Sequence, residues 1–142
     1  MFRTLTNDIF VAPQIGVDAV AEAKDLGVAL IINNRPEGES DDQVPGAQIE
    51  AAARAAGIAY VAIPITHSGF SEPQVHAMVE ALSGAKGKVL AYCRSGTRST
   101  LLWALAESAQ GGDPDALTNM AAKAGYDVSP VRPLMDMLKA RR

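Results

Sequence analysis

The residues best suited to chemistry lie in one stretch, Val89 to Ser99, which contains the only cysteine of the chain, Cys93. An apolar run typical of a strand ends at this cysteine, and a hydrophobic helical pattern extends from Ser99 to about Gln110. A cysteine at the N-terminus of a helix lies near converging backbone N–H groups and the positive end of the helix dipole. Because this field favours both a thiolate and a bound oxyanion, the stretch predicts an anion-binding nucleophile.

Several residue types around Cys93 suit such a site. Gly96 lets successive N–H groups of the turn point inward, because a side chain there would fill the space. Arg98 offers a planar fork for two oxyanion oxygens, and the Ser99 hydroxyl can donate a hydrogen bond to the sulfur. The catalytic candidates are therefore Cys93, Arg98 and Ser99, and the substrate-binding candidates of this loop are Arg94, Ser95, Gly96 and Thr97. The alternative is a buried structural cysteine at a strand end.

The composition favours a small soluble protein with a single domain. At 142 residues and 48% hydrophobic content, the chain is predicted to form one domain spanning residues 1–142. With 13 basic and 16 acidic residues it has no basic patch for nucleic acid, except for a few cations at its C-terminal end.

Cysteine and histidine are scarce, which limits the metal and redox chemistry that we expect. One cysteine and two histidines exclude an internal disulfide framework and a closed structural zinc site, so we expect no metal and no cofactor. The N-terminus has no signal-peptide pattern, and no apolar run approaches the length of a membrane span, which predicts a cytoplasmic protein that does not contact membranes.

The chain alternates between strand and helix patterns. Strands are expected in a hairpin over residues 5–12 and then at 28–32, 58–65 and 88–92; helices are expected at 17–26, 47–56, 71–82 and 99–110, with two more starting near Asp113 and Ser129. The continuous apolar runs predict strands buried on both faces, 58–65 included. The predicted fold class is α/β, with a mostly parallel central sheet flanked by helices.

Two polar loops are expected to join Cys93 at the carboxyl edge of this sheet, because each follows a strand. The first, Asn33–Gly46, contains Arg35, which either contacts substrate or pairs with Glu37 or Glu39. The second, Thr66–Phe70, contains His67, a candidate for a catalytic or binding role. Arg35 and His67 therefore complete the substrate-binding candidates.

Three motifs carry a resemblance to known families. The heptapeptide Cys-Arg-Ser-Gly-Thr-Arg-Ser, residues 93–99, resembles the active-site loop of rhodanese-type sulfurtransferases. Together with Pro13–Ile15 and Ile32–Glu39, the stretch Tyr92–Ser99 is similar to the phosphatase-like domain of bacterial beta-lactamase-hydrolase-like proteins. That family is a branch of the cysteine-phosphatase superfamily related to dual-specificity phosphatases. The resemblance implies a cysteine-phosphatase-like fold.

Two departures from the phosphatase pattern favour sulfur chemistry. Phosphatases of this type place five residues between cysteine and arginine, whereas only residues 94–97 separate Cys93 from Arg98. They also carry a general-acid Asp upstream, but residues 64–72 contain none, and only His67 or Glu72 could substitute. An alkoxide leaving group without a matched acid loses roughly 10²–10⁴ in rate, whereas sulfite leaves as a stable anion.

The favoured prediction is therefore a sulfurtransferase that acts on a small anion, in which Cys93 takes sulfur from thiosulfate or a persulfide and becomes a persulfide itself. The alternative is a phosphatase that forms a cysteinyl phosphate on the same residue. A noncatalytic redox or anion-sensing module is a third possibility. The longer relatives carry a metallo-hydrolase-like domain, so a role in sulfide detoxification predicts a separate persulfide dioxygenase as partner.

Overall fold

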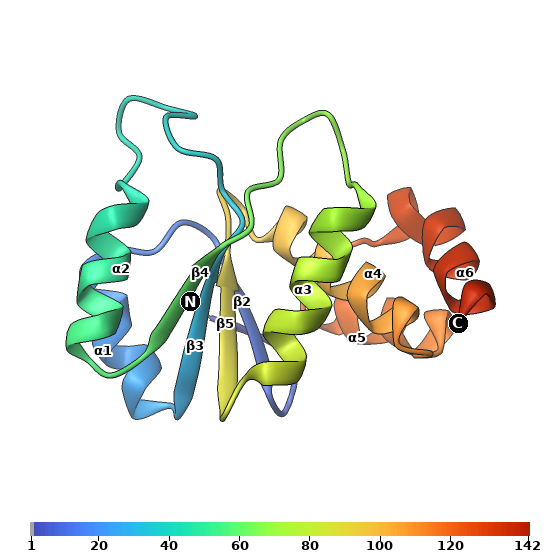
Figure 1. The fold of residues 1–142 in the computed structure, drawn as a ribbon, viewed down its shortest axis with the longest axis horizontal. Helices are drawn as coiled ribbons and strands as arrows, with labels where there is room; N and C mark the ends of the chain where they lie inside the picture. Colours follow the sequence, from blue (N-terminus) through green and yellow to red (C-terminus); the bar gives the residue numbers. More distant parts are fainter. Residues whose placement is uncertain (1) are drawn as a thin grey trace.

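A five-stranded sheet forms the centre of the molecule, and the computed structural model describes residues 2–142. The strand order is β1-β2-β5-β3-β4, with β1 antiparallel to β2 and every other neighbouring pair parallel. Helices α1 and α2 cover one face, and α3, α4, α5 and α6 lie on the other (Figure 1). The α/β class and the mostly parallel, doubly covered sheet are confirmed.

The strands are β1 Arg3–Thr6, β2 Ile9–Ala12, β3 Val28–Asn33, β4 Ala59–Ala62 and β5 Lys88–Tyr92. The α-helices are α1 Val17–Asp25, α2 Gly46–Ala55, α3 Glu72–Gly84, α4 Thr97–Ala109, α5 Pro114–Lys123 and α6 Arg132–Arg141, with a 3-10 turn at Ser129–Val131. None of the helices within residues 2–142 has both the length and the apolarity needed to cross a membrane.

Strand β5 lies at the centre of the sheet, and its alternating side chains enter two separate hydrophobic clusters. Leu90 and Tyr92 point into the cluster beneath α1 and α2, while Val89 and Ala91 enter the larger one beneath α3 to α6. This double burial explains the unbroken apolar run in the sequence. It also fixes the end of β5, and hence Cys93, firmly at the middle of the carboxyl edge.

The clearest differences from the sequence prediction concern β4, α4 and α6. The strand predicted at 58–65 is shorter and lies at the sheet edge as β4, where Ala59 and Ala62 are exposed rather than buried. Hydrophobicity does not reveal strand order, and here β5 inserts between β2 and β3 and leaves β4 outermost. Helix α4 begins at Thr97 rather than Ser99, and α6 begins at Arg132, after the 3-10 turn that Pro130 enters.

The two polar loops and the start of α4 meet at one end of the sheet, at the top of Figure 1. Backbone hydrogen bonds continue past the strands there: Asn34 N–H donates to Tyr92 O at 2.8 Å, and Ile65 N–H donates to Asn34 O at 2.9 Å. The convergence that parallel topology predicts is therefore present, and it brings the loops over the Cys93 turn.

Candidate active site

Cys93 lies fully buried in the turn between β5 and α4. Its sulfur accepts a hydrogen bond from the backbone N–H of Gly96, with a nitrogen–sulfur distance of 3.1 Å. Gly96 adopts a φ of 93°, in the left-handed region that side chains disfavour, and so ends the turn and starts the helix. The sulfur is thus held against a backbone donor at the start of the helix.

The Ser99 hydroxyl is engaged elsewhere. It donates to Asn34 Oδ1 at 2.8 Å instead of to the sulfur, and the Asn34 amide in turn donates to Ile63 O at 2.9 Å. Ser99 therefore ties the first turn of α4 to the end of β3 and to the segment after β4. The hydrogen bond from Ser99 to the sulfur that the sequence predicts is absent from this structure, because the Ser99 hydroxyl donates its hydrogen bond to the buried Asn34 oxygen instead.

Tyr126 supports the Cys93 turn from outside. Its hydroxyl donates to Ser95 O at 3.1 Å, and it lies so close to Gly96 that a Cβ added there would overlap the tyrosine oxygen. Burial raises the pKa of Tyr126, so its proton stays available for this bond. Arg3 lies over the tyrosine ring at 5.4 Å and donates to Ala124 O at 2.8 Å, which fixes this segment against β1.

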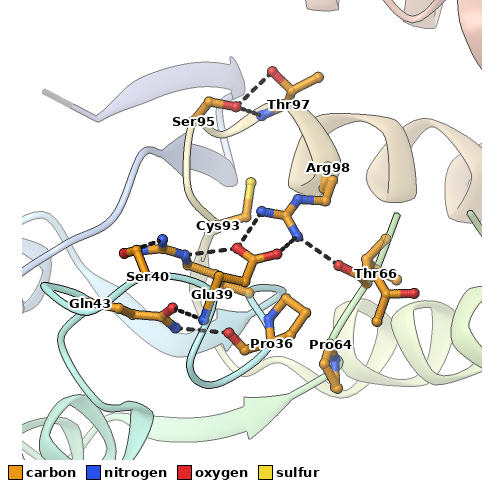
Figure 2. A network of polar contacts seen from close by, with 12 residues as sticks. Pro36, Glu39, Ser40, Gln43, Pro64, Thr66, Cys93, Ser95, Thr97 and Arg98 are labelled. Carbon is orange, nitrogen blue, oxygen red and sulfur yellow. Dashed lines mark hydrogen bonds and ion pairs between the residues drawn. The ribbon is translucent and has the colours of Figure 1, made fainter. Parts of the chain in front are cut away.

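Arg98 is held by two loops (Figure 2). Its Nη1 and Nη2 donate to the two carboxylate oxygens of Glu39 at 2.7 and 2.8 Å, and Nη1 also donates to Ile65 O at 2.8 Å. Hydrogen bonding to Glu39 raises the pKa of Arg98, and the charge of Cys93 acts in the same direction. The guanidinium is thus fixed beside the sulfur.

Glu39 is an ionised carboxylate between two arginines. Hydrogen bonding to Arg98 lowers its pKa to about 2, and a second bond to Arg35 acts in the same direction, both against the effect of burial. Arg35 Nε donates to the Glu39 oxygen Oε1 at 2.9 Å. The structure contains the Glu39 pairing of Arg35 that the sequence left open, and it does not contain a pairing with Glu37.

The other predicted site residues lie around this centre. Arg94, Ser95 and Thr97 are exposed at its rim, and the Ser95 hydroxyl donates to Thr97 Oγ1 at 3.0 Å. His67 is exposed in the loop between β4 and α3. Glu72, the alternative acid, pairs with Arg141 of α6 at 2.8 Å and so is directed toward a different helix.

Sequence reasoning missed Glu39 as the partner of Arg98, Asn34 as the partner of Ser99, and Tyr126 as a support of the turn. Two of them carry a signal: Asn34 directly follows a buried strand, and Glu39 lies four residues after Arg35 within a conspicuous polar motif. Tyr126 carries none, because its partner Ser95 is 31 residues away and the contact depends on how α5 docks.

A family model of the phosphatase-like domain of beta-lactamase hydrolase-like proteins matches residues 1–111. The chain belongs to this family. A curated beta-lactamase hydrolase-like protein from Xylella fastidiosa is 40% identical over 85 residues, which are 60% of this chain and 20% of that protein. One from Agrobacterium fabrum is 38% identical over 85 residues, with the same coverage. The match thus spans about a fifth of each curated relative's length.

Solved structures agree with this assignment. A candidate phosphatase from Neisseria meningitidis is 30% identical, with a TM-score of 0.83 and coverage of 96% of both chains. PTPMT1 shares the fold at 15% identity, with a TM-score of 0.74 over 99% of this chain and 98% of its own. The family model and the Neisseria structure favour phosphatase chemistry over the sulfur transfer that the loop spacing predicted, and they support neither sulfide detoxification nor a persulfide dioxygenase partner.

Proposed function

We propose that this chain is a cysteine-dependent phosphatase that acts on small phosphate esters, with Cys93 as its nucleophile. The observation that carries the proposal is the setting of the sulfur, which accepts the Gly96 N–H at 3.1 Å beside the fixed Arg98 guanidinium. Membership of a phosphatase-like family supports the same chemistry.

The reaction takes two steps. The Cys93 thiolate attacks phosphorus, an S–P bond forms, and the P–O bond to the leaving group breaks, so that the alcohol departs with a proton from a donor or from water. Water then attacks the cysteinyl phosphate, the S–P bond breaks, and inorganic phosphate leaves as the thiolate re-forms.

Backbone N–H groups near Cys93 suit the phosphoryl oxygens. Within residues 2–142, the N–H groups of Arg94, Ser95, Arg98 and Ser99 have no protein acceptor. Two of these groups belong to the first turn of α4, where N–H groups lack an intrahelical partner and favour anions. Donors of this kind stabilise charge that develops on oxygen in the transition state.

The acid that protonates the leaving group is the weakest part of the site. The segment from residue 64 to 72 contains no Asp, and Glu72 is paired with Arg141. His67 is the remaining candidate donor. We therefore expect aryl phosphates, whose leaving groups need little protonation, to be hydrolysed faster than alkyl phosphates by more than their intrinsic reactivity predicts.

Sulfur transfer is the second candidate, and one observation favours it. Four residues instead of five separate Cys93 from Arg98, which is the spacing of the rhodanese-type loop that the sequence resembles. In that reaction the thiolate attacks the outer sulfur of thiosulfate, the S–S bond breaks and sulfite leaves. An acceptor thiol or cyanide then takes the sulfur from the Cys93 persulfide.

The test compares both reactions in the wild type and Cys93→Ser. We expect the wild type to hydrolyse 4-nitrophenyl phosphate. Cys93→Ser should reduce the rate of this hydrolysis by about 10³-fold or more, because it removes the nucleophile. Thiosulfate:cyanide transfer should be slower than hydrolysis. If sulfur transfer is faster than hydrolysis and depends on Cys93, the second candidate replaces the phosphatase proposal. If either activity survives Cys93→Ser, Cys93 is not the nucleophile of that reaction.

The role of His67 has a matched control in the other histidine. His76 lies on α3, pairs with Glu80 at 2.9 Å and is exposed. We expect His67→Asn to slow alkyl phosphate hydrolysis about tenfold or more and aryl phosphate hydrolysis less, and His76→Asn to change neither. Equal effects on both substrates would exclude His67 as the proton donor.

A further inference from the structure

Each nitrogen of Arg35 already donates one hydrogen bond within the protein, which leaves one hydrogen on each Nη. Nε donates to Glu39, Nη1 donates to Gln14 Oε1 at 3.0 Å, and Nη2 donates to Ser40 Oγ at 3.2 Å. Its side chain is 4% exposed. These bonds hold the guanidinium inside the protein, so its positive charge acts first on its neighbours, Glu39 above all, rather than directly on a substrate.

Glu39 poses the complementary problem. Its carboxylate bonds both nitrogens at one edge of the Arg98 guanidinium, and one negative charge so close to one positive charge cancels most of its attraction for an anion. An anion-binding arginine that is neutralised in this way would be a poor one. Arg35 binds the same carboxylate, and the three residues together carry a net charge of about +1, since Arg98 and Arg35 are cations and Glu39 is an anion.

The geometry leaves the useful edge of Arg98 open. Glu39 and the Ile65 carbonyl use Nη1 fully and one hydrogen of Nη2, and no oxygen atom within residues 2–142 accepts from Nε. Figure 2 shows Nε and Nη2 on the side of the Cys93 sulfur and the start of α4. Glu39 therefore fixes the orientation of the fork without covering the edge that faces the nucleophile.

We infer that Arg35 and Glu39 are positioning residues for the oxyanion site: Glu39 orients Arg98, and Arg35 supplies the buried charge that keeps the Arg35–Glu39–Arg98 triad positive. The inference rests on the oxyanion-binding part of the proposed function. It separates two quantities, because charge governs the affinity for an anion and orientation governs the rate of the chemical step.

The experiment measures the affinity for inorganic phosphate by calorimetry, and kcat with 4-nitrophenyl phosphate, in four variants. Arg35→Gln makes the triad neutral and should weaken phosphate binding about tenfold, which corresponds to about 1.4 kcal/mol. Arg35→Lys keeps the charge and should bind within about threefold of the wild type. Glu39→Gln should lower kcat about tenfold without weakening phosphate binding, because it frees the fork while adding positive charge.

The double variant Arg35→Gln/Glu39→Gln distinguishes a role of Arg35 through its charge from a role as a scaffold only. Its triad again carries a charge of about +1, so phosphate affinity should return to near the wild-type value while kcat stays low. Phosphate binding as weak as in Arg35→Gln would overturn the inference, because Arg35 would then act only as a scaffold. If Arg35→Gln alone does not fold, Glu39→Gln, with a triad charge of about +2, should still bind phosphate more tightly than the double variant at about +1, and equal affinities would overturn the inference.

A surface pair provides the control. Arg54 and Glu50 on α2 also form an ion pair four residues apart, at 2.8 Å, but their side chains are 61% and 41% exposed. Arg54→Gln and Glu50→Gln should leave affinity and kcat unchanged. The binding arm is independent of the reaction: loss of Cys93-dependent hydrolysis in the wild type would overturn the proposed function, whereas affinities that do not follow the triad charge would overturn this inference.

Discussion

Two of the loops at the site, the Cys93 turn and the loop after β3, acquire their shapes in different ways. The Cys93–Gly96 turn is short, and its shape is set locally by the end of a buried strand, a glycine with positive φ and the start of a helix. The loop from Asn34 to Pro45 has no helix or strand of its own and is held by side chains: Gln43 bonds Glu39 N and Pro36 O, each at 2.9 Å.

This difference assigns different tasks to the loops. The short turn carries Cys93, the proposed nucleophile, and its backbone donors, so we expect changes there to act on the reacting atoms. The long loop reaches the site through Glu39, so changes there act on the orientation and charge of Arg98. We therefore expect the short turn to determine the reaction itself, and the long loop to adjust the orientation and charge of Arg98.

The largest effect expected from this comparison comes from two arginines, Arg94 in the short turn and Arg98 in the first turn of the helix that follows it. Arg98 is fixed beside the sulfur by Glu39 and Ile65, whereas Arg94 is exposed at the rim. Arg98→Ala should lower kcat/KM about 10²- to 10³-fold, as the loss of a preorganised charge donor does. Arg94→Ala should lower it less than about tenfold, mainly through KM. Equal losses in steady-state kinetics would contradict the distinction.

A pair of glycines, one from each loop, gives the next effect. Gly96 and Gly38 both have positive φ, 93° and 73°, but a Cβ would overlap Tyr126 at Gly96 and meet nothing within 4 Å at Gly38. Both changes to Ala cost about 1–2 kcal/mol of backbone strain. Only Gly96→Ala should also lower kcat/KM, by about tenfold or more, because Tyr126 and the Ser95 carbonyl must shift. Chemical denaturation and kinetics together separate the two outcomes.

The ion pair that joins the loops gives a smaller, pH-dependent effect. The pKa of Glu39 is lowered from 4.5 to about 2, so its stabilisation is fully present above pH 4.5 and is lost as pH falls toward 2. Glu39→Gln should reduce the free energy of unfolding by about 2 kcal/mol at pH 7, discounted for partial solvent contact, and by progressively less below pH 4.5. A difference that grows on acidification would show that the sign is wrong.

The smallest effect belongs to the exposed part of the long loop. Asp42 accepts a hydrogen bond from Ser40 at 2.7 Å, which lowers its pKa, but it is exposed. Asp42→Asn should change thermal stability by an amount close to measurement error and leave kcat within about twofold of the wild type. A large loss of activity would mean that the rim of this loop contacts substrate.

The short turn could be predicted from the sequence, whereas the contacts of the long loop could be predicted only in part. Cys93, Gly96 and Arg98 follow from an apolar strand, a glycine turn and a hydrophobic helix, and their meeting with the two polar loops follows from parallel topology. The edge position of β4 and the hydrogen bond from Ser99 to Asn34 could not be predicted. Strand order and long-range polar pairing leave no periodic pattern in the sequence.

The three motif segments behind the family resemblance prove to be one network. Gln14 N–H donates to Arg94 O at 3.2 Å, and Gln14 Oε1 accepts from Arg35, which bonds Glu39, the partner of Arg98. The motif residues are therefore related by contact although they are far apart in the chain. Sequence reasoning recognised the segments but could not connect them.

The most direct test of the account is the identity of the group that Cys93 carries during turnover. The protein is acid-quenched during 4-nitrophenyl phosphate hydrolysis and, separately, after thiosulfate addition, and the peptide that contains Cys93 is weighed by mass spectrometry. We predict a phosphoryl group on Cys93 in the first sample, absent in Cys93→Ser. A Cys93 that never carries phosphorus but gains one sulfur atom from thiosulfate would contradict the proposed phosphatase.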